Sequence, residues 1–220
     1  MKDSLKRLDM LAIKEIASNP KLFILLDPHF DNDVKTKLFI KECLKKITTR
    51  RSLLRLQWFS EIADGMEEIK GNRPALKLVF LMALAEGVAT KRIGLSASRE
   101  MGSQKVIHEF FKYISKADKT KLTYGIRRSL IGTRIHKLNF SSIIRILYQL
   151  RNDAVHGIDF WSFSLVNERS DKWGKIAMLT EGKLGTIKNK RRISLTVNLY
   201  YQELKDIFIR TAISNISAQL

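Results

Sequence analysis

Apolar residues recur at helical spacing through most of this chain, and the pattern predicts a mainly helical protein. The first 70 residues contain three such runs: Leu5 to Ile16, ended by Asn19-Pro20; Asp33 to Ile47, with Leu38, Ile40 and Leu44; and Arg50 to Ile69, with Leu53, Leu54 and Trp58. The next helix begins at Pro74 and extends to about Val88. It is almost entirely apolar, as is typical of a helix buried on most of its sides.

The second half of the chain mixes helices with a short β element. A loop is expected from Gly94 to Gly102, followed by a helix from Gln104 to Lys116 and a basic, less regular segment. The next helix contains Ile143, Leu147 and Leu150, and we expect Ser141-Ser142 to cap its start. Lys175 to Leu179 and Arg192 to Val197 have β propensity and flank a Gly/Lys-rich stretch, which predicts a small hairpin. A final helix is expected from about Leu199 to Ile213.

The turn Gly71-Asn72-Arg73-Pro74 is the clearest break between predicted helices. We place a domain boundary there, which divides the chain into an N-terminal helical region, residues 1–72, and a second domain, residues 73–220. The expected fold is mainly α, with the hairpin inserted before the C-terminal helix.

Charge is the strongest bulk signal. The chain carries 40 Lys and Arg against 22 Asp and Glu, which gives a net charge of +18. No acid lies between Asp118 and Asp153, and none lies between Gly182 and Gln202. Segregated bases favour a nucleic-acid partner over a solubilising surface or contact with anionic lipid. The bases that we expect to bind RNA are Arg127, Arg128, Arg134, Lys137, Arg145, Lys188, Lys190, Arg191 and Arg192.

Several classes of protein lack support in the sequence. The lone Cys43 excludes an internal disulfide and a multi-cysteine zinc site, and the chain has neither a P-loop nor a dinucleotide-binding motif. We therefore expect no metal and no cofactor. We see no secretory signal, and the most apolar stretch, Ala75 to Ala89, is too short to span a bilayer, so we expect a cytoplasmic protein without a membrane partner.

One motif carries candidate chemistry, the run Arg151-Asn152-Asp153-Ala154-Val155-His156. With 16 Arg and 4 His in 220 residues, the bare Arg-to-His spacing, allowing for small variations, arises by chance about once. Requiring Asn directly after Arg lowers the expectation to roughly 0.04. On a helix, Ile143, Leu147, Leu150 and Ala154 would form the core face, and Arg151, Asn152 and His156 would share the neighbouring arc.

Together with the preceding apolar helix that ends Ala85-Glu86-Gly87 and the aromatic pair Phe110-Phe111, this motif resembles the signature of HEPN domains, an Arg followed by a polar residue and then a His. The resemblance covers about Pro74 to the C-terminus and implies a HEPN-like helical bundle. It also implies a metal-independent endoribonuclease with Arg151, Asn152 and His156 as catalytic residues.

Such chemistry needs a base for the 2′-hydroxyl and an acid for the leaving oxygen, and a His can do either task. Arg151 would hold the scissile phosphate, and Asn152 would orient His156 or the phosphate. One motif supplies one His, and HEPN proteins bring two motifs together by dimerising. The resemblance thus implies a homodimer with a composite site and 2′,3′-cyclic phosphate products. Many such proteins are toxins or defence nucleases, which implies an antitoxin or inhibitory partner.

Other interpretations stay open at this point. Arg151 can be a surface residue paired with Asp153 or Asp159, and Glu86 is either a partner near the site or a structural ion pair. We expect Trp58, Trp161 and Trp173 to pack in a core or interface in preference to stacking on bases. The alternative function is a non-catalytic RNA- or nucleotide-binding HEPN module within a larger complex. A helical DNA-binding protein is a third reading, for which we find no recognition helix.

Overall fold

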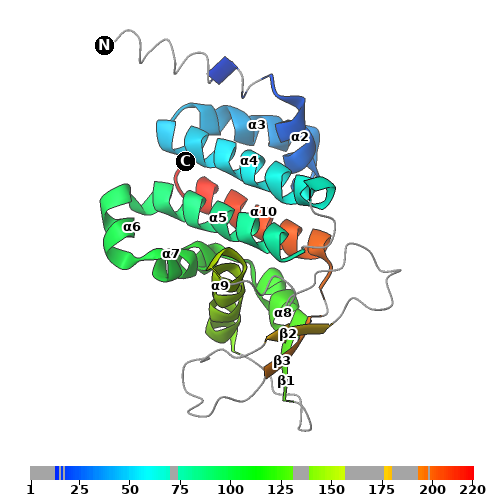
Figure 1. Ribbon diagram of the computed structural model, residues 1–220. Helices are drawn as coiled ribbons and strands as arrows, with labels where there is room; N and C mark the ends of the chain where they lie inside the picture. Colours follow the sequence, from blue (N-terminus) through cyan, green and yellow to red (C-terminus); the bar gives the residue numbers. More distant parts are fainter. Residues whose placement is uncertain are drawn as a thin grey trace.

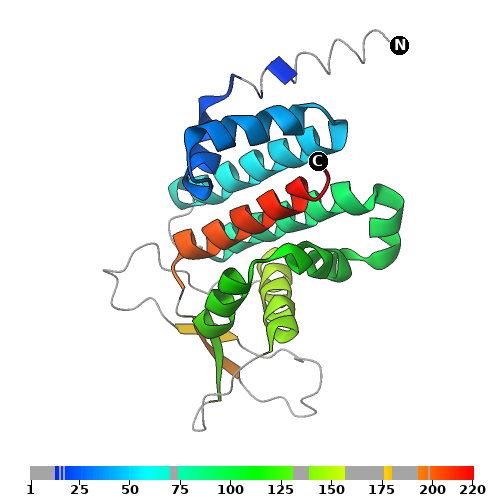
Figure 2. The ribbon, with the colours of Figure 1, turned by 180° about the vertical axis from the view of Figure 1, so that it is seen from behind.

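The computed structural model describes residues 13, 14, 16, 18–69, 74–130, 139–156, 176–179, 193–197 and 199–220. Helices dominate this part of the chain and stack in layers (Figure 1). The upper layer holds α2 (Pro20–Leu26), η1 (Asp27–His29), α3 (Asp33–Leu44) and α4 (Ile47–Ile69). The middle layer holds α5 (Pro74–Ile93) and α10 (Tyr201–Ser217), which lie side by side in both ribbon views (Figure 2). Beneath them lie α6 (Leu95–Met101), α7 (Ser103–Phe110), η2 (Phe111–Tyr113), α8 (Lys116–Gly125) and α9 (Phe140–His156).

The apolar helix α5 is the centre of the fold. It contacts α4, α7, α9 and α10, so it is covered on several sides, as its sequence predicts. Its fully buried side chains are Leu78, Leu81, Met82, Leu84, Ala85, Val88 and Ala89. Even Lys77 is buried, and its Nζ lies 4.6 Å from the centre of the Tyr201 ring on α10.

The N-terminal helices join the same hydrophobic core. Buried residues from α2, α4 and α5, such as Leu22, Leu53 and Leu78, belong to one cluster. The Asn19 side chain accepts hydrogen bonds from the backbone N–H groups of Lys21 and Leu22 and so caps α2, with Pro20 as the first helical residue. The boundary at residues 72 and 73 stays a prediction; the described segments on its two sides pack together through α4 and α5.

Polar contacts fix α10 to three other helices. Arg210 donates two hydrogen bonds, of 2.9 and 2.6 Å, to the buried Asp118 on α8. Tyr201 and Lys205 both donate to Asp64 on α4, at 2.8 and 2.6 Å. Asn215 donates to the carbonyl of Phe110 on α7 at 2.9 Å. Because buried donors and acceptors are costly to leave unpaired, these contacts select one position for α10.

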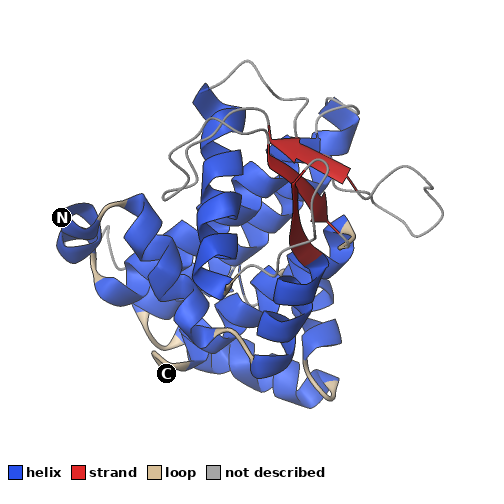
Figure 3. Cartoon of the chain, turned by 90° about the horizontal axis from the view of Figure 1, so that it is seen from below, coloured by secondary structure: helices blue, strands red, loops and turns tan. Residues whose placement is uncertain are grey.

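A small antiparallel sheet lies beside α8, at the end of the molecule away from α3 (Figure 1), and Figure 3 shows its strands in red. Its strands are β1 (Ile126–Leu130), β2 (Ile176–Leu179) and β3 (Ile193–Val197), in the order β1-β3-β2. The register pairs Ile126 with Val197 and Ile176 with Thr196. The expected hairpin stays a prediction, because residues 180–192, which would connect its strands, lie outside the described residues.

The mainly α expectation is confirmed, and some local expectations are wrong. Residues 95–101, expected in a loop, form α6, with Gly94 and Gly102 at positive φ on its two sides. Part of the basic segment that we expected to be irregular forms α8. On α3 the buried residues are Thr36, Phe39 and Cys43, whereas Leu38 is 55% exposed.

We expected Trp58 to pack in a core or an interface, and the structure excludes the core of this chain. Its side chain is 54% exposed on α4, so it does not pack in the core of this chain. In the described residues, no helix is long and apolar enough to cross a membrane.

Two glycines give a matched test of the packing. A methyl group at the buried Gly125 would lie 2.7 Å from Cδ1 of the buried Leu199, so Gly125→Ala should lower the free energy of unfolding by about 1–3 kcal/mol. At Gly65, within α4, the same methyl group would meet no atom within 4 Å. Gly65→Ala should therefore raise the free energy of unfolding by about 0.5–1 kcal/mol. Urea denaturation measures both, and equal effects of the two variants would contradict the packing of α8 against Leu199.

Candidate active site

Helix α9 carries the Arg151 motif and is held by the face that the sequence predicts. Ile143, Leu147, Leu150 and Ala154 are all buried, so the predicted core face is confirmed. The cap is different from the expected Ser141-Ser142: the Asn139 side chain accepts from the backbone N–H of Ser142 at 2.8 Å. The helix continues to His156, so the whole motif lies on one helix.

Arg151 is partly buried and is contacted on several sides. Its Nη1 donates to Oδ1 of Asn152 at 2.9 Å, and its Nη2 lies 3.7 Å from Oε2 of Glu86 on α5. The guanidinium carbon is 5.9 Å from the centre of the Tyr148 ring, one turn earlier on α9. Its Nε is buried and has no hydrogen-bond partner among the described residues. These contacts together orient the guanidinium.

Glu86 connects this group to a third helix. The Ser103 hydroxyl, at the start of α7, donates to Oε1 of Glu86 at 2.6 Å, while Oε2 faces Arg151. The side chains of Glu86 and Arg151 are 28% and 23% exposed, so the pair lies at the edge of the core and remains in contact with solvent. Glu86 therefore lies beside the motif and also forms an ion pair, so the contact fits both interpretations of this residue.

The last residues of the motif are described only in part. His156 is the final residue of α9, one turn after Asn152, but its side chain and that of Asp153 lie outside the described residues, as does Asp159. The pairing of Arg151 with Asp153 or Asp159 is therefore untested. The acidic partner that the structure does give Arg151 is Glu86.

Of the bases that we expect to bind RNA, Arg145 is described completely, and it is exposed on α9. Arg127 and Arg128 lie in β1, and their side chains are not among the described ones. Arg134, Lys137, Lys188, Lys190, Arg191 and Arg192 all lie outside the described residues.

Burial, and then the neighbouring Arg145, lower the pKa of His108 on α7, so this imidazole is neutral at pH 7.

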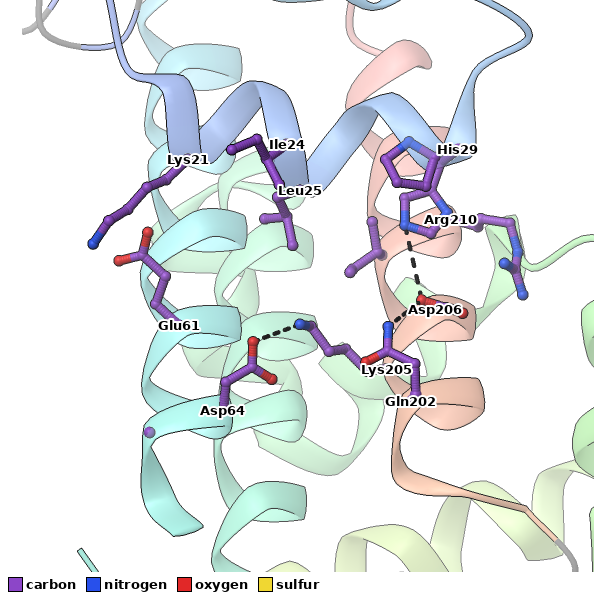
Figure 4. Close-up of a pocket in the computed structure, with 13 residues that line it drawn as sticks. Lys21, Ile24, Leu25, His29, Glu61, Asp64, Gln202, Lys205, Asp206 and Arg210 are labelled. Carbon is purple, nitrogen blue, oxygen red and sulfur yellow. Dashed lines mark hydrogen bonds and ion pairs between the residues drawn. The ribbon is translucent and has the colours of Figure 1, made fainter. Parts of the chain in front are cut away.

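A cavity of about 680 Å³ lies between α2, α4 and α10, and no residue of the motif lines it (Figure 4). Two ion pairs form within its lining, Lys205 with Asp64 at 2.6 Å and His29 with Asp206 at 4.0 Å, and Lys21, Glu61 and Arg210 line it as well. Burial is the main cause that lowers the pKa of His29. The cavity is thus separate from the Arg151 site, and the Lys and Arg residues of its lining are balanced by as many Asp and Glu residues, so it has no evident charge preference.

The described residues contain no group of three or more His, Cys, Asp or Glu side chains that could hold a metal ion. Burial raises the pKa of the Cys43 thiol to about 12, so this buried side chain is a poor nucleophile.

Comparisons with known protein families, with curated proteins and with solved structures find no match to this chain.

The contact between Glu86 and Arg151 can be measured directly. A double-mutant cycle with Glu86→Ala, Arg151→Ala and both together should give a coupling energy of about 0.5–1 kcal/mol in the free energy of unfolding. The value is modest because the two groups are 3.7 Å apart and partly solvated. The measurement is urea denaturation of the four proteins, and strictly additive effects would show that the two side chains do not interact in solution.

Proposed function

We propose that this protein is a metal-independent endoribonuclease with a HEPN-like fold. The observation that carries the proposal is the arrangement around Arg151: a partly buried guanidinium, oriented by Asn152 and Glu86, on a helix whose last residue is His156. A permanent planar cation at a fixed position suits the recognition of a phosphate. The net charge of +18 supports a polyanionic substrate.

The proposed reaction is an internal transesterification of RNA. The 2′-oxygen loses its proton to a base, forms a bond to the phosphorus, and the bond from phosphorus to the 5′-oxygen breaks. The leaving oxygen takes a proton from an acid, and the products are a 2′,3′-cyclic phosphate and a 5′-hydroxyl. His156 would carry one of the two proton transfers, and Arg151 would stabilise the charge that develops on the phosphoryl oxygens.

Asn152 takes a more specific role than the sequence allows us to assign. Because its Oδ1 accepts from Arg151, its amide orients the guanidinium. Its Nδ2 has no hydrogen-bond partner among the described residues and would be available to donate to a phosphate oxygen. Glu86, held by Ser103, would act as a positioning residue that keeps Nη2 of Arg151 in place before RNA binds.

The second proton-transfer group would come from a second copy of the chain. A homodimer that brings two α9 C-termini together would place two His156 residues in one composite site. Val155, adjacent to His156, is 48% exposed and would be covered at such an interface. A toxin or defence role, with an inhibitory partner protein, is the biological setting that this chemistry fits.

One observation favours a second function, a non-catalytic RNA-binding module. Nη1 and Nη2 of Arg151 already face Asn152 and Glu86, and Glu86 is a negative charge that an incoming phosphate would have to approach. The second function predicts salt-sensitive RNA binding with no cleavage.

The test of cleavage uses total tRNA and ribosomal RNA in excess EDTA. We expect wild-type protein to cleave, His156→Ala to lower the rate by about 10²–10⁴, and Arg151→Ala to lower it by about 10²–10³. Product ends are identified chemically, and a 2′,3′-cyclic phosphate is expected. His108→Gln is the matched control, since it alters a histidine outside the motif and should leave the rate unchanged. Equal activity in wild type, His156→Ala and Arg151→Ala would exclude the proposed mechanism.

The composite site makes a separate prediction about assembly. Light scattering should show a dimer at micromolar concentration, and Val155→Asp should shift it to monomer and abolish cleavage, because a charge cannot be buried unpaired at the interface. Leu95→Asp, at another exposed apolar residue (57% exposed, on α6), should leave both properties intact. A wild-type monomer that still cleaves RNA would refute the composite site.

A further inference from the structure

Three cations meet on the surface where α4 crosses α5. Nη1 of Arg55 donates to the carbonyl of Gly87 at 2.8 Å, which fixes the register of the two helices. The helices run in opposite directions (Figures 1 and 2). Arg51 lies one turn before Arg55, and Lys91 lies one turn after Gly87, so Arg51 and Lys91 fall opposite each other and next to Arg55.

No acid balances this cluster in the described part of the chain. Neither Arg51 nor Lys91 has an ion pair there, and the hydrogen-bond acceptor of Arg55 is a backbone carbonyl. Burial and then the nearby Arg51 lower the pKa of Arg55, and burial followed by Arg55 and Arg51 lowers the pKa of Lys91. The three charges therefore repel one another, and an anion bound among them would relieve that repulsion.

An exposed indole continues the same face of α4. Arg51, Arg55, Trp58 and Ile62 are spaced four, three and four residues apart, which places them on one narrow stripe. Trp58 is 54% exposed and Ile62 39% exposed. Such large apolar side chains on a monomer surface, beside cations, are typical of a binding face.

Helix α5 connects the stripe to the Arg151 site. Arg55 reaches the carbonyl of Gly87 from α4, whereas Arg151 faces the adjacent residue, Glu86, from α9. The two guanidinium groups thus contact successive residues of α5 from two of the helices that cover it, α4 and α9.

We propose that Arg51, Arg55, Lys91 and Trp58, here called the α4–α5 patch, bind a single-stranded segment of RNA. The cations hold its phosphates, and the indole stacks on a base, which matches the alternation of phosphate and base along a single strand. The choice of RNA as the ligand rests on the proposed function, and the patch extends the binding surface from Arg151 across α5 onto α4. The helical region before residue 73 then contributes part of the RNA-binding surface.

The test measures binding of a short fluorescein-labelled 2′-O-methyl oligouridine by fluorescence anisotropy over a range of salt concentrations. The 2′-O-methyl group keeps bases and phosphates but prevents attack by the 2′-oxygen, so the probe stays intact. Arg51→Gln and Lys91→Gln should each reduce the slope of log affinity against log salt by about 0.7, the value for one phosphate contact on a single strand. Trp58→Ala should weaken binding roughly 5- to 100-fold at fixed salt and leave the slope unchanged.

Lys116→Gln is the charge-matched control, because Lys116 is exposed at the start of α8, and it should change neither affinity nor slope. Thermal melting followed by circular dichroism verifies that each variant is folded. Affinity and slope equal to wild type in all three patch variants would overturn the proposal. The proposal would also be overturned if the patch variants bound RNA as tightly as wild type but no longer bound phosphatidylserine vesicles. That result would assign the patch to a membrane surface.

The patch and the proposed nuclease can fail independently. If cleavage depends on His156 but the patch variants bind RNA like wild type, the nuclease proposal stands and the patch proposal is refuted. If RNA binding depends on the patch but natural RNA is not cleaved, the patch proposal stands and the nuclease proposal is refuted.

Discussion

The burial of α5 is the constraint on which the rest of this structure depends. A helix with apolar residues on nearly every side cannot face water, so other helices must cover it. Here α4, α7, α9 and α10 do so, and they come from both halves of the chain. Polar contacts such as Arg210 to Asp118 and Asn215 to the Phe110 carbonyl then select one arrangement among the many that would bury the same apolar area.

The same helix brings the charged groups together. Glu86 and Gly87 are partly buried residues of α5, and each is approached by a guanidinium group, Arg151 from α9 and Arg55 from α4. Gly87 permits the approach of Arg55, because a methyl group there would lie only 3.1 Å from the Arg55 side chain. Packing in the core thus determines the spacing of cations at the surface, and through it the chemistry that the surface can support.

Positive charge is distributed differently in space from its distribution along the sequence. The acid-free windows at 119–152 and 183–201 contain the bases that the sequence predicts to bind RNA, all in the second half of the chain. The α4–α5 patch joins Arg51 and Arg55 to Lys91, which is 36 residues away from Arg55, and acids such as Glu61 and Glu86 lie nearby in the sequence. Those acids face other partners, Gln57 and Arg151, so a window average conceals a local excess of cations.

The sequence by itself determined the helical class of the protein, the buried character of α5, and the core face of α9 at Ile143, Leu147, Leu150 and Ala154. These features are local, because backbone geometry fixes the periodicity of a helix whatever it packs against. Only the tertiary structure decided that Phe39 is buried and Leu38 exposed, that Trp58 faces outward, and that Glu86 is the partner of Arg151. Each of those outcomes depends on which helices face one another, and that choice follows from long-range packing that no local pattern encodes.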